Sequence, residues 1–163
     1  MEGNLCPMTD VVVPLTVRDL TTEDLPALAW AGSGPTEALD RAGRGEVDYL
    51  IVCQPSRFPL ATGGVDYTLV PGAGTLWQLS VHEAVRSCGI GTILVHALEQ
   101  RIQERGLHHA ELGVDDQFSR PRRLYERLGY VAYGNEPGSW PQVGPDGSST
   151  LYETTITLMH KTL

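Results

Sequence analysis

The stretch Arg86-Ser87-Cys88-Gly89-Ile90-Gly91-Thr92 decides the fold, because it joins two segments whose apolar residues recur with different periods. Before it, Leu76–Val81 is predicted as a strand, and a period of two residues places Trp77, Leu79 and Val81 on one face. After it, apolar residues recur every four positions, which predicts an amphipathic helix that Gly106 ends. The apolar stripe of this helix comprises Ile90, Leu94, Leu98 and Ile102, together with Ile93 and Ala97.

A strand that leads through a short glycine-containing turn into a helix creates a site for an anion. The first N–H groups of the helix have no partner within it, and the helix dipole adds partial positive charge at the same end. A phosphate or a pyrophosphate is therefore the expected ligand of this turn.

Two common nucleotide-binding motifs do not occur in the sequence. A P-loop needs a Gly-Lys pair, and the chain has none. A dinucleotide-binding fingerprint needs a third glycine, but Leu94 occupies that position. The pattern that does occur is Arg-x-x-Gly-x-Gly, formed by Arg86, Gly89 and Gly91. A nucleotide-binding α/β domain is therefore a secondary hypothesis.

This pattern resembles the acyl-CoA-binding motif of the GNAT superfamily of N-acetyltransferases, and the resemblance extends along most of the chain. Val81–Arg86 resembles the approach to the binding loop, and Leu124-Tyr125-Glu126-Arg127-Leu128-Gly129-Tyr130 resembles a late signature of the family. Val17–Leu25 is similar to the first strand and the start of the first helix, and Met159–Leu163 is similar to the last strand. The order and spacing of these segments also agree with the family.

The resemblance implies an α/β fold of the α+β type, in which helices flank a mixed, mostly antiparallel, twisted sheet. Its central parallel strands, here predicted to end at Val81 and Val114, are expected to splay apart after a bulge. The 163 residues suit one domain with a sizeable core. We therefore expect an N-terminal tail at residues 1–13 and a single GNAT domain at residues 14–163.

The resemblance also implies that the ligand of the turn is acetyl-CoA, or a related acyl-CoA, used as a cosubstrate. N–H groups from Ser87 to Thr92 would hold the pyrophosphate, and the pantetheine arm would pair with the backbone of the preceding strand. Phe118 stands where the family often has Asn, and it would pack against the pantetheine or the adenine. Cys88 is expected to contribute its backbone N–H rather than a reactive thiol. The full predicted set is Leu79, Val81, Arg86, Ser87, Cys88, Gly89, Ile90, Gly91, Thr92 and Phe118.

Tyr125 matches the tyrosine with which the family donates a proton to the departing CoA thiolate. Its alternative interpretation is an aromatic residue of the core. The general base stays open: some relatives carry a glutamate at the position of Gly113, and Glu111 points to the wrong face if Leu112 is buried. The remaining candidates are His82, Glu83, Asp115 and a chain of water molecules.

Two segments are expected to surround the acceptor. By analogy with the family, Trp30–Leu39, at the junction of two early helices, would contact the substrate. Asn135–Thr150 is rich in Gly and Pro and long for a connection, so we expect a loop that covers the substrate as a lid. Trp140 within it would either contact the substrate or anchor the loop.

Composition narrows the partners and the compartment. The net charge of −8 and the lack of a basic stripe argue against nucleic acid and are compatible with a cationic amine substrate. No apolar run reaches the roughly 18 residues of a membrane span, and Met1–Asp10 lacks the features of a signal peptide, so a cytoplasmic protein is expected. The three cysteines show no Cys-x-x-Cys spacing, and no metal site is expected. A homodimer is compatible with the resemblance.

The functional hypothesis is the transfer of an acetyl group from acetyl-CoA directly to a primary amine of a small molecule or a peptide. The alternative is a non-catalytic acyl-CoA-binding or regulatory domain, which the missing base and Phe118 favour. Small amines, antibiotics, amino acids and protein N-termini all carry the required nitrogen.

Overall fold

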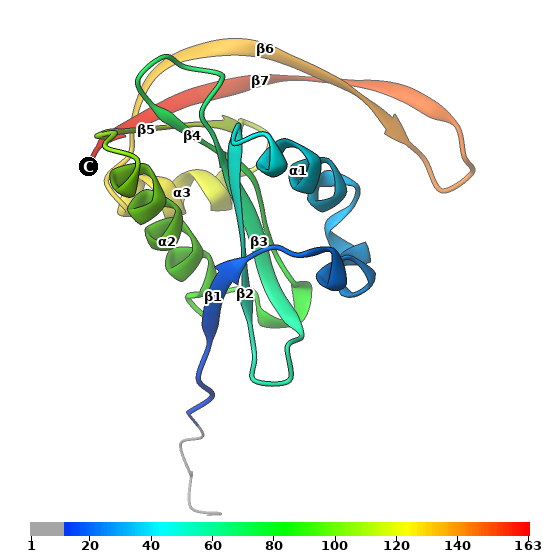
Figure 1. Ribbon diagram of the computed structural model, residues 1–163. Coiled ribbons are helices and arrows are strands. Elements are labelled where there is room, and N and C mark those ends of the chain that lie inside the picture. Colours follow the sequence, from blue (N-terminus) through cyan, green and yellow to red (C-terminus); the bar gives the residue numbers. More distant parts are fainter. Residues whose placement is uncertain (1–11) are drawn as a thin grey trace, which may run out of the picture.

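Seven strands form a single mixed sheet in the computed structural model, which describes residues 12–163 (Figure 1). The strand order is β1-β2-β3-β4-β5-β7-β6, and every neighbouring pair is antiparallel except β4 and β5. The strands are β1 (Thr16–Asp19), β2 (Val47–Cys53), β3 (Pro59–Asp66), β4 (Gly74–Val81), β5 (His109–Asp115), β6 (Val131–Val143) and β7 (Ser149–Thr162). The helices are η1 (Thr22–Ala31), α1 (Gly34–Gly43), η2 (Glu83–Val85), α2 (Ile90–Glu104) and α3 (Ser119–Arg127). The predicted mixed, mostly antiparallel α/β fold is confirmed.

The predicted N-terminal tail, residues 1–13, falls almost entirely outside the described part of the chain. Val12 and Val13 are exposed and precede β1 without regular structure. The division into a tail and a domain at residues 14–163 stays a prediction.

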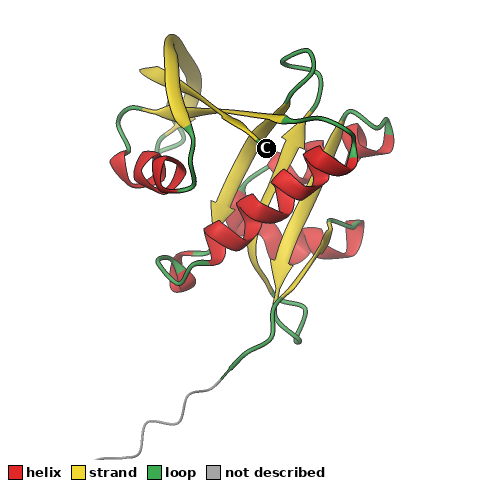
Figure 2. Ribbon diagram, turned by 90° about the vertical axis from the view of Figure 1, so that its left-hand side faces the viewer, coloured by secondary structure: helices red, strands yellow, loops and turns green. Residues whose placement is uncertain are grey.

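Helices cover both faces of the sheet, as the strand β2 illustrates. Leu50 and Val52 of β2 pack in one apolar cluster with α2, whereas Tyr49 and Ile51 pack in a second cluster with η1 and α1. Side chains of a strand alternate between its two faces, so a strand that is apolar at every position is covered on both sides. Figure 2 shows the long helix α2 lying across one face of the central strands.

A β-bulge in β4 reverses the alternation that the sequence predicts there. Thr62 of β3 pairs with Ser80 of β4 and Gly64 pairs with Trp77, so β4 has one extra residue over this interval. The bulge lies at Gln78, whose φ is 52°. As a result Trp77 packs in the cluster of η1 and α1, and Leu79 packs in the cluster of α2. The prediction that Trp77, Leu79 and Val81 share one face is therefore wrong, because a one-residue shift moves a side chain to the other face.

The parallel pair β4–β5 diverges soon after it begins. Gly74 pairs with Ala110 and Thr75 pairs with Glu111, and no further pairs follow within the described chain. Beyond them, β5 continues as a partner of β7 alone, while β4 continues beside β3. This divergence confirms the predicted splay of the central strands.

Most of the predicted apolar stripe of α2 is buried, with one exception. Ile90, Leu94, Leu98 and Ile102 contribute to the core cluster. Ile93 is 39% exposed, and its predicted place in the stripe is wrong. Val95 takes that place, because a helix turns by 3.6 residues rather than 4.

A salt bridge fixes the first helix to β1. Arg18 donates two hydrogen bonds, of 2.8 and 2.7 Å, to the carboxylate of Asp24. The same carboxylate accepts the N–H of Thr21 and its hydroxyl, at 2.8 and 2.9 Å, which forms a capping box. The hydrogen bonds from Arg18 outweigh the desolvation of Asp24 and lower its pKa to about 2.

The segment predicted as a lid is a long β-hairpin instead of a loop. Residues of β6 up to Val143 pair with β7 from Ser149 onward, and the turn between them is closed by hydrogen bonds from Ser148 to Asp146. The hairpin arches away from the rest of the sheet (Figure 1). Pro137 and Pro141 misled the prediction. The two prolines are four residues apart, so they point to the same side of the strand. An edge strand such as β6 tolerates prolines, because a nitrogen that faces away from the partner strand needs no hydrogen to donate.

Three further features concern the described residues as a whole. No helix between residues 12 and 163 has the length and apolar character needed to cross a membrane. Within the same range, no three His, Cys, Asp or Glu side chains gather in a way that could hold a metal ion. Cys53 is buried and Cys88 is exposed, and both are free thiols.

Candidate active site

The loop before α2 turns sharply at two residues with left-handed backbone angles. Ser87 has a φ of 65° and Gly89, which immediately precedes the helix, has a φ of 80°. A Cβ added at Gly89 would meet no heavy atom within 4 Å, so the space beside it is open. A Cβ at Gly91 would lie 3.4 Å from Cδ2 of Leu124, because α3 packs against the first turn of α2. The two glycines thus have different roles. Gly89 allows the left-handed turn of the backbone, and Gly91 allows α3 to approach closely.

Six consecutive N–H groups of this loop are free of protein acceptors. Those of residues 87–92 donate to no acceptor among residues 12–163. The first N–H that does donate belongs to Ile93, which reaches the carbonyl of Gly89 at 3.3 Å. Because α2 is 15 residues long, its dipole adds positive potential at this end. The arrangement suits a doubly charged pyrophosphate.

Two arginines lie at the loop. Nε of Arg86 donates to the carbonyl of Val81 at 3.4 Å, so its side chain braces the loop against the end of β4. Arg120 of α3 donates from Nη2 to the hydroxyl of Ser87 at 2.6 Å. Neither guanidinium forms a salt bridge with a carboxylate of the described chain. Sequence reasoning identified Arg86 but missed Arg120, for which the short arginine-rich run before Tyr125 was a usable signal.

A cleft of about 880 Å³ opens where β4 and β5 diverge. The residues that line it are Leu76, Trp77, Gln78 and Leu79 of β4, Leu112, Gly113 and Asp115 of β5, Tyr125 of α3 and Trp140 of β6. A smaller cavity of about 200 Å³, between β1, α1 and β2, lies apart from the loop and has none of these residues in its lining. The volume of the larger cleft is within the range of small-molecule sites.

Tyr125 is at once a packing residue and a lining residue of the cleft. Its ring meets the ring of Tyr130 edge-on, at 5.9 Å between centroids, and it packs against the main core cluster. Its hydroxyl has no hydrogen-bond partner among residues 12–163. Burial raises the pKa of Tyr125 to about 12. The phenol therefore carries its proton at neutral pH and can donate it within the cleft.

Asp115 presents a carboxylate to the same cleft. Its Oδ2 accepts the hydroxyl of Tyr152 at 2.9 Å, and its Oδ1 accepts the hydroxyl of Thr154 at 2.6 Å. Oδ1 also accepts the N–H of Gln117 at 2.9 Å. Desolvation opposes the ionisation of Asp115, but these three hydrogen bonds outweigh it and lower the pKa. The group is therefore a stable anion at neutral pH.

A comparison with protein-family models shows to which family the chain belongs. The family model described as "Acetyltransferase (GNAT) family" matches residues 19–130. The chain belongs to the GNAT acetyltransferase family.

Solved structures of GNAT proteins share the fold at low sequence identity. The ribosomal-protein-S18-alanine N-acetyltransferase of Escherichia coli is 20% identical, with a TM-score of 0.71 over 91% of this chain and 94% of the other. The IAA acetyltransferase of Bacillus cereus is 13% identical, with a TM-score of 0.70 over 92% and 100%. The ribosomal-protein-alanine N-acetyltransferase of Brucella melitensis is 19% identical, with a TM-score of 0.69 over 91% and 99%. No curated protein sequence matches the chain.

The candidates for the general base differ in whether they line the cleft of this GNAT protein. His82 accepts the N–H of Ala84 on Nδ1 at 3.2 Å, and its ring lies between those of Trp30 and Phe58. Glu83 is exposed in η2. Neither residue lines the cleft, whereas Asp115 does.

Gly113 and Glu111 also have defined places. Gly113 lines the cleft without a side chain, and a Cβ there would lie 2.8 Å from Cγ2 of Ile156. Leu112 is buried, so Glu111 lies on the opposite face, where it accepts the hydroxyl of Tyr133 at 2.7 Å. Of the carboxylates considered from the sequence, the structure brings only Asp115 together with Tyr125.

The remaining predicted residues of this GNAT site lie around the loop and the cleft. Leu79 lines the cleft, and Val81 is half-buried at the end of β4. Phe118 precedes α3 and is 58% exposed, and its contact with the pantetheine or the adenine stays a prediction. The thiol of Cys88 is a weak donor to the carbonyl of Arg86, at 3.6 Å. Ile90 is buried in the core, and its N–H is one of the six that donate to no acceptor among residues 12–163.

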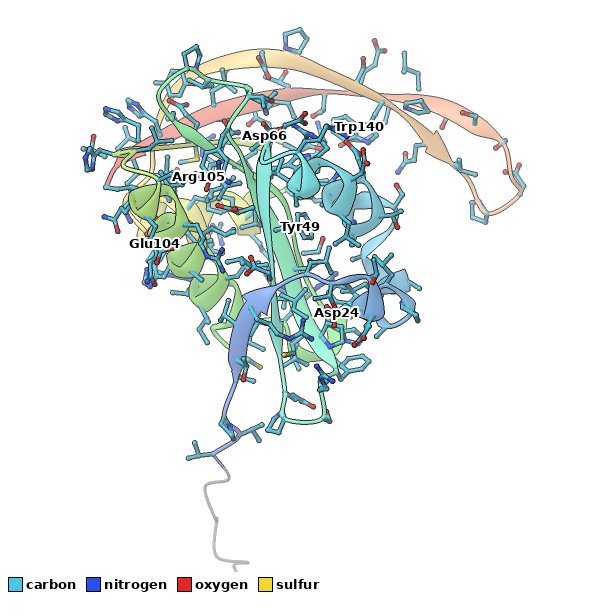
Figure 3. The ribbon with its side chains drawn as sticks, viewed as in Figure 1. Asp24, Tyr49, Asp66, Glu104, Arg105 and Trp140 are labelled. Atoms are coloured by element: carbon cyan, nitrogen blue, oxygen red, sulfur yellow. The ribbon has the colours of Figure 1, made fainter. Side chains whose placement is uncertain are left out.

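Of the two segments predicted to touch the acceptor, one contributes a lining residue of the cleft, and the other only approaches a lining residue. Gln78 of the bulge covers Gly34, at the junction of η1 and α1: a Cβ on this glycine would lie 1.9 Å from Oε1 of Gln78. Trp140 lines the cleft from the inner side of the arched hairpin (Figure 3). Its ring lies 4.9 Å from that of Tyr152 on the neighbouring strand. Sequence reasoning did not identify Tyr152 or Thr154, because their link to Asp115 depends on the pairing of β5 with β7.

Proposed function

We propose that this GNAT protein transfers an acetyl group from acetyl-CoA directly to a primary amine of a small molecule or a peptide. The observation that carries the proposal is the combination of six free N–H groups at residues 87–92 with the protonated phenol of Tyr125 in the adjoining cleft. The first feature suits the diphosphate of CoA, and the second suits the sulfur atom that leaves.

The loop and the divergence of the strands together accommodate the length of acetyl-CoA. The diphosphate accepts hydrogen bonds from the loop, and Arg120 adds positive charge beside Ser87. Beyond Thr75, the edge of β4 that faces β5 has no strand partner in the described chain. The backbone of Leu79 is therefore free on that side to pair with an amide of pantetheine, as an added strand would, and the N–H of Val81 extends this edge beside the carbonyl that accepts Arg86.

The chemistry requires an ammonium acceptor to lose two protons from nitrogen, one before and one after the attack, and the departing sulfur to gain one. The neutral amine attacks the thioester carbon, a C–N bond forms, and the C–S bond breaks as the CoA thiolate departs. Tyr125 donates its hydrogen bond to the sulfur as negative charge develops there. An alkylammonium has a pKa of about 10.4, so the acceptor first gives a proton to water or to a base. After the C–N bond forms, the nitrogen loses a second proton, and this second proton balances the one gained by sulfur.

A non-catalytic acyl-CoA-binding domain is the second candidate. The observation that favours it is Gly113, which lines the cleft without the carboxylate that some relatives carry there. In that case CoA binds to the loop, and no amine is acetylated.

Thiol release from acetyl-CoA tests the proposal and separates the two candidates. The amines are phenethylamine, putrescine, lysine and a peptide that begins with alanine. We expect turnover with at least one of them, and Tyr125→Phe should lower kcat by about 100-fold. Tyr133→Phe is the matched control, because its hydroxyl pairs with Glu111 outside the cleft.

Two outcomes contradict the proposal. Calorimetric binding of CoA without thiol release for any amine supports the non-catalytic candidate. A chain that binds neither CoA nor acetyl-CoA at millimolar concentration excludes both candidates.

A further inference from the structure

Among residues 12–163, one charged side chain lines the cleft, and it forms no salt bridge. Of the residues that line it in the described chain, Asp115 alone is ionisable to an anion at neutral pH. Five other aspartates of residues 12–163 pair with arginines: Asp19, Asp24, Asp40, Asp48 and Asp66. Asp115 is held by two hydroxyls and an N–H, and no cationic side chain of the described chain reaches it. This fixed carboxylate in the cleft therefore has no cationic partner within the described part of the chain.

We propose that Asp115 and the aromatic pair Trp140–Tyr152 form the subsite that binds the acceptor, as an ammonium next to an apolar or aromatic group. This inference rests on the proposed function and names the chemical class of its acceptor. Asp115 binds the ammonium through charge, and the rings bind the group attached to it.

The carboxylate retains the capacity for this contact. An ionised carboxylate has about four positions that accept hydrogen bonds. Tyr152, Thr154 and the N–H of Gln117 occupy three of them, and only one of the three is on Oδ2. A fourth donor on Oδ2 completes the set. The existing bonds also fix the rotamer of Asp115, so little entropy is lost when a ligand binds.

Asp115 faces the side of the sheet from which an acceptor can meet the thioester. Ala110, Leu112 and Val114 of β5 are buried in the cluster of α2. Because strand side chains alternate, Asp115 points to the opposite face. The helix α2, which the loop precedes, packs on the other face, so the Asp115 subsite and the loop lie on different sides of β5.

The aromatic pair gives the subsite an apolar wall. Trp140 and Tyr152 are cross-strand partners in the hairpin, and their rings are tilted by 40° at 4.9 Å. The ring of Tyr152 forms part of this wall, and its hydroxyl donates a hydrogen bond to Asp115. An aromatic face beside a carboxylate suits an organic ammonium, because the ring attracts the cation and packs against its substituent. Figure 3 places Trp140 beneath the arch of the hairpin.

Binding of two probes of equal shape tests the subsite without any need for turnover. Calorimetry on the full chain saturated with CoA compares phenethylamine, a cation at neutral pH, with 2-phenylethanol, its neutral analogue. We expect phenethylamine to bind roughly tenfold more tightly, as a charge-assisted hydrogen bond allows. Asp115→Asn should abolish this preference, because the amide keeps the shape of the side chain without its charge.

Two further variants complete the design. Glu153→Gln removes an equal charge from an exposed position beside Tyr152 and should keep the preference. Trp140→Leu should reduce the preference for phenethylamine over ethylamine while Asp115 remains, which tests the wall if Asp115→Asn fails to fold.

Several outcomes overturn the subsite. They are equal binding of phenethylamine and 2-phenylethanol to the unaltered chain, undetectable binding of both at millimolar concentration, and an undiminished preference in Asp115→Asn. The failure of the proposed function has another signature: the charge preference depends on Asp115, but acetyl-CoA releases no thiol.

Discussion

Arg120, in the first turn of α3, donates a hydrogen bond of 2.6 Å to the hydroxyl of Ser87, in the loop that precedes α2. The two residues are 33 positions apart in the sequence. The bond joins the helix that carries Tyr125 to the loop whose N–H groups are free. The helix of the proposed proton donor and the proposed phosphate site are therefore parts of one structure.

Replacing Arg120 should weaken the binding of CoA. Arg120→Ala removes the cation beside the loop and releases Ser87, so we expect the affinity for CoA to fall roughly tenfold. Arg122→Ala is the control on the same helix, because its guanidinium pairs with Glu126 instead. Calorimetry with CoA measures both. Equal losses in the two variants would mean that the effect is one of net charge alone.

Replacing Gly89 should strain the loop. A non-glycine residue at a φ of 80° costs about 1 kcal/mol, and the free N–H groups shift to relieve the strain. We expect Gly89→Ala to lower both the melting temperature and the affinity for CoA. Gly43→Ala, at the end of α1, meets no atom within 4 Å and should stabilise the fold by about 0.5 kcal/mol. Thermal unfolding with and without CoA compares them, and an unchanged affinity in Gly89→Ala would contradict the assigned role of the loop.

Titration of Tyr125 should make the fold less stable in alkali. Burial raises its pKa to about 12 in the folded chain, above the value of about 10 for an unfolded tyrosine. Its contribution is therefore complete below pH 10 and is lost as the pH rises through 12. Urea unfolding between pH 8 and 12 should show a smaller alkaline loss in Tyr125→Phe than in the unaltered chain. Equal slopes would mean that the ring is already hydrated.

Protonation of Asp24, which weakens its ion pair with Arg18, should make the fold less stable in acid. The pKa of Asp24 falls from 3.8 to about 2 on folding, so its contribution is complete above pH 4 and is lost as the pH falls through 2. Asp24→Asn should cost about 2 kcal/mol at pH 7, since it weakens the ion pair and the helix cap together. Asp40→Asn, which removes an exposed partner of Arg44, should cost far less. Urea unfolding from pH 7 to pH 2 distinguishes the two, and a full acid dependence in Asp24→Asn would contradict the assignment.

The sequence predicted the elements near the loop well, because the signals are local. The strand before the loop, the helix after it and the parallel crossover to β5 follow from apolar periods and the positions of glycines. The prediction failed at the hairpin, where Gly and Pro indicate a loop but β7 supplies partners for the whole of β6. It failed also for the face of Trp77, because the position of the bulge in β4 depends on the register with β3.

The sequence by itself determined that a strand meets a helix at Gly89, that the N–H groups of the first turn lack partners, and that a tyrosine follows on a later helix. Those features depend on residues close together in the chain. Only the tertiary structure decided that Asp115, rather than His82 or Glu83, shares the cleft with Tyr125. It also decided that Tyr152 and Thr154, 37 and 39 residues away, hold that carboxylate. The physical reason is that these contacts depend on the strand register of β5 and β7 and on where β4 and β5 separate, and neither is encoded in a local pattern.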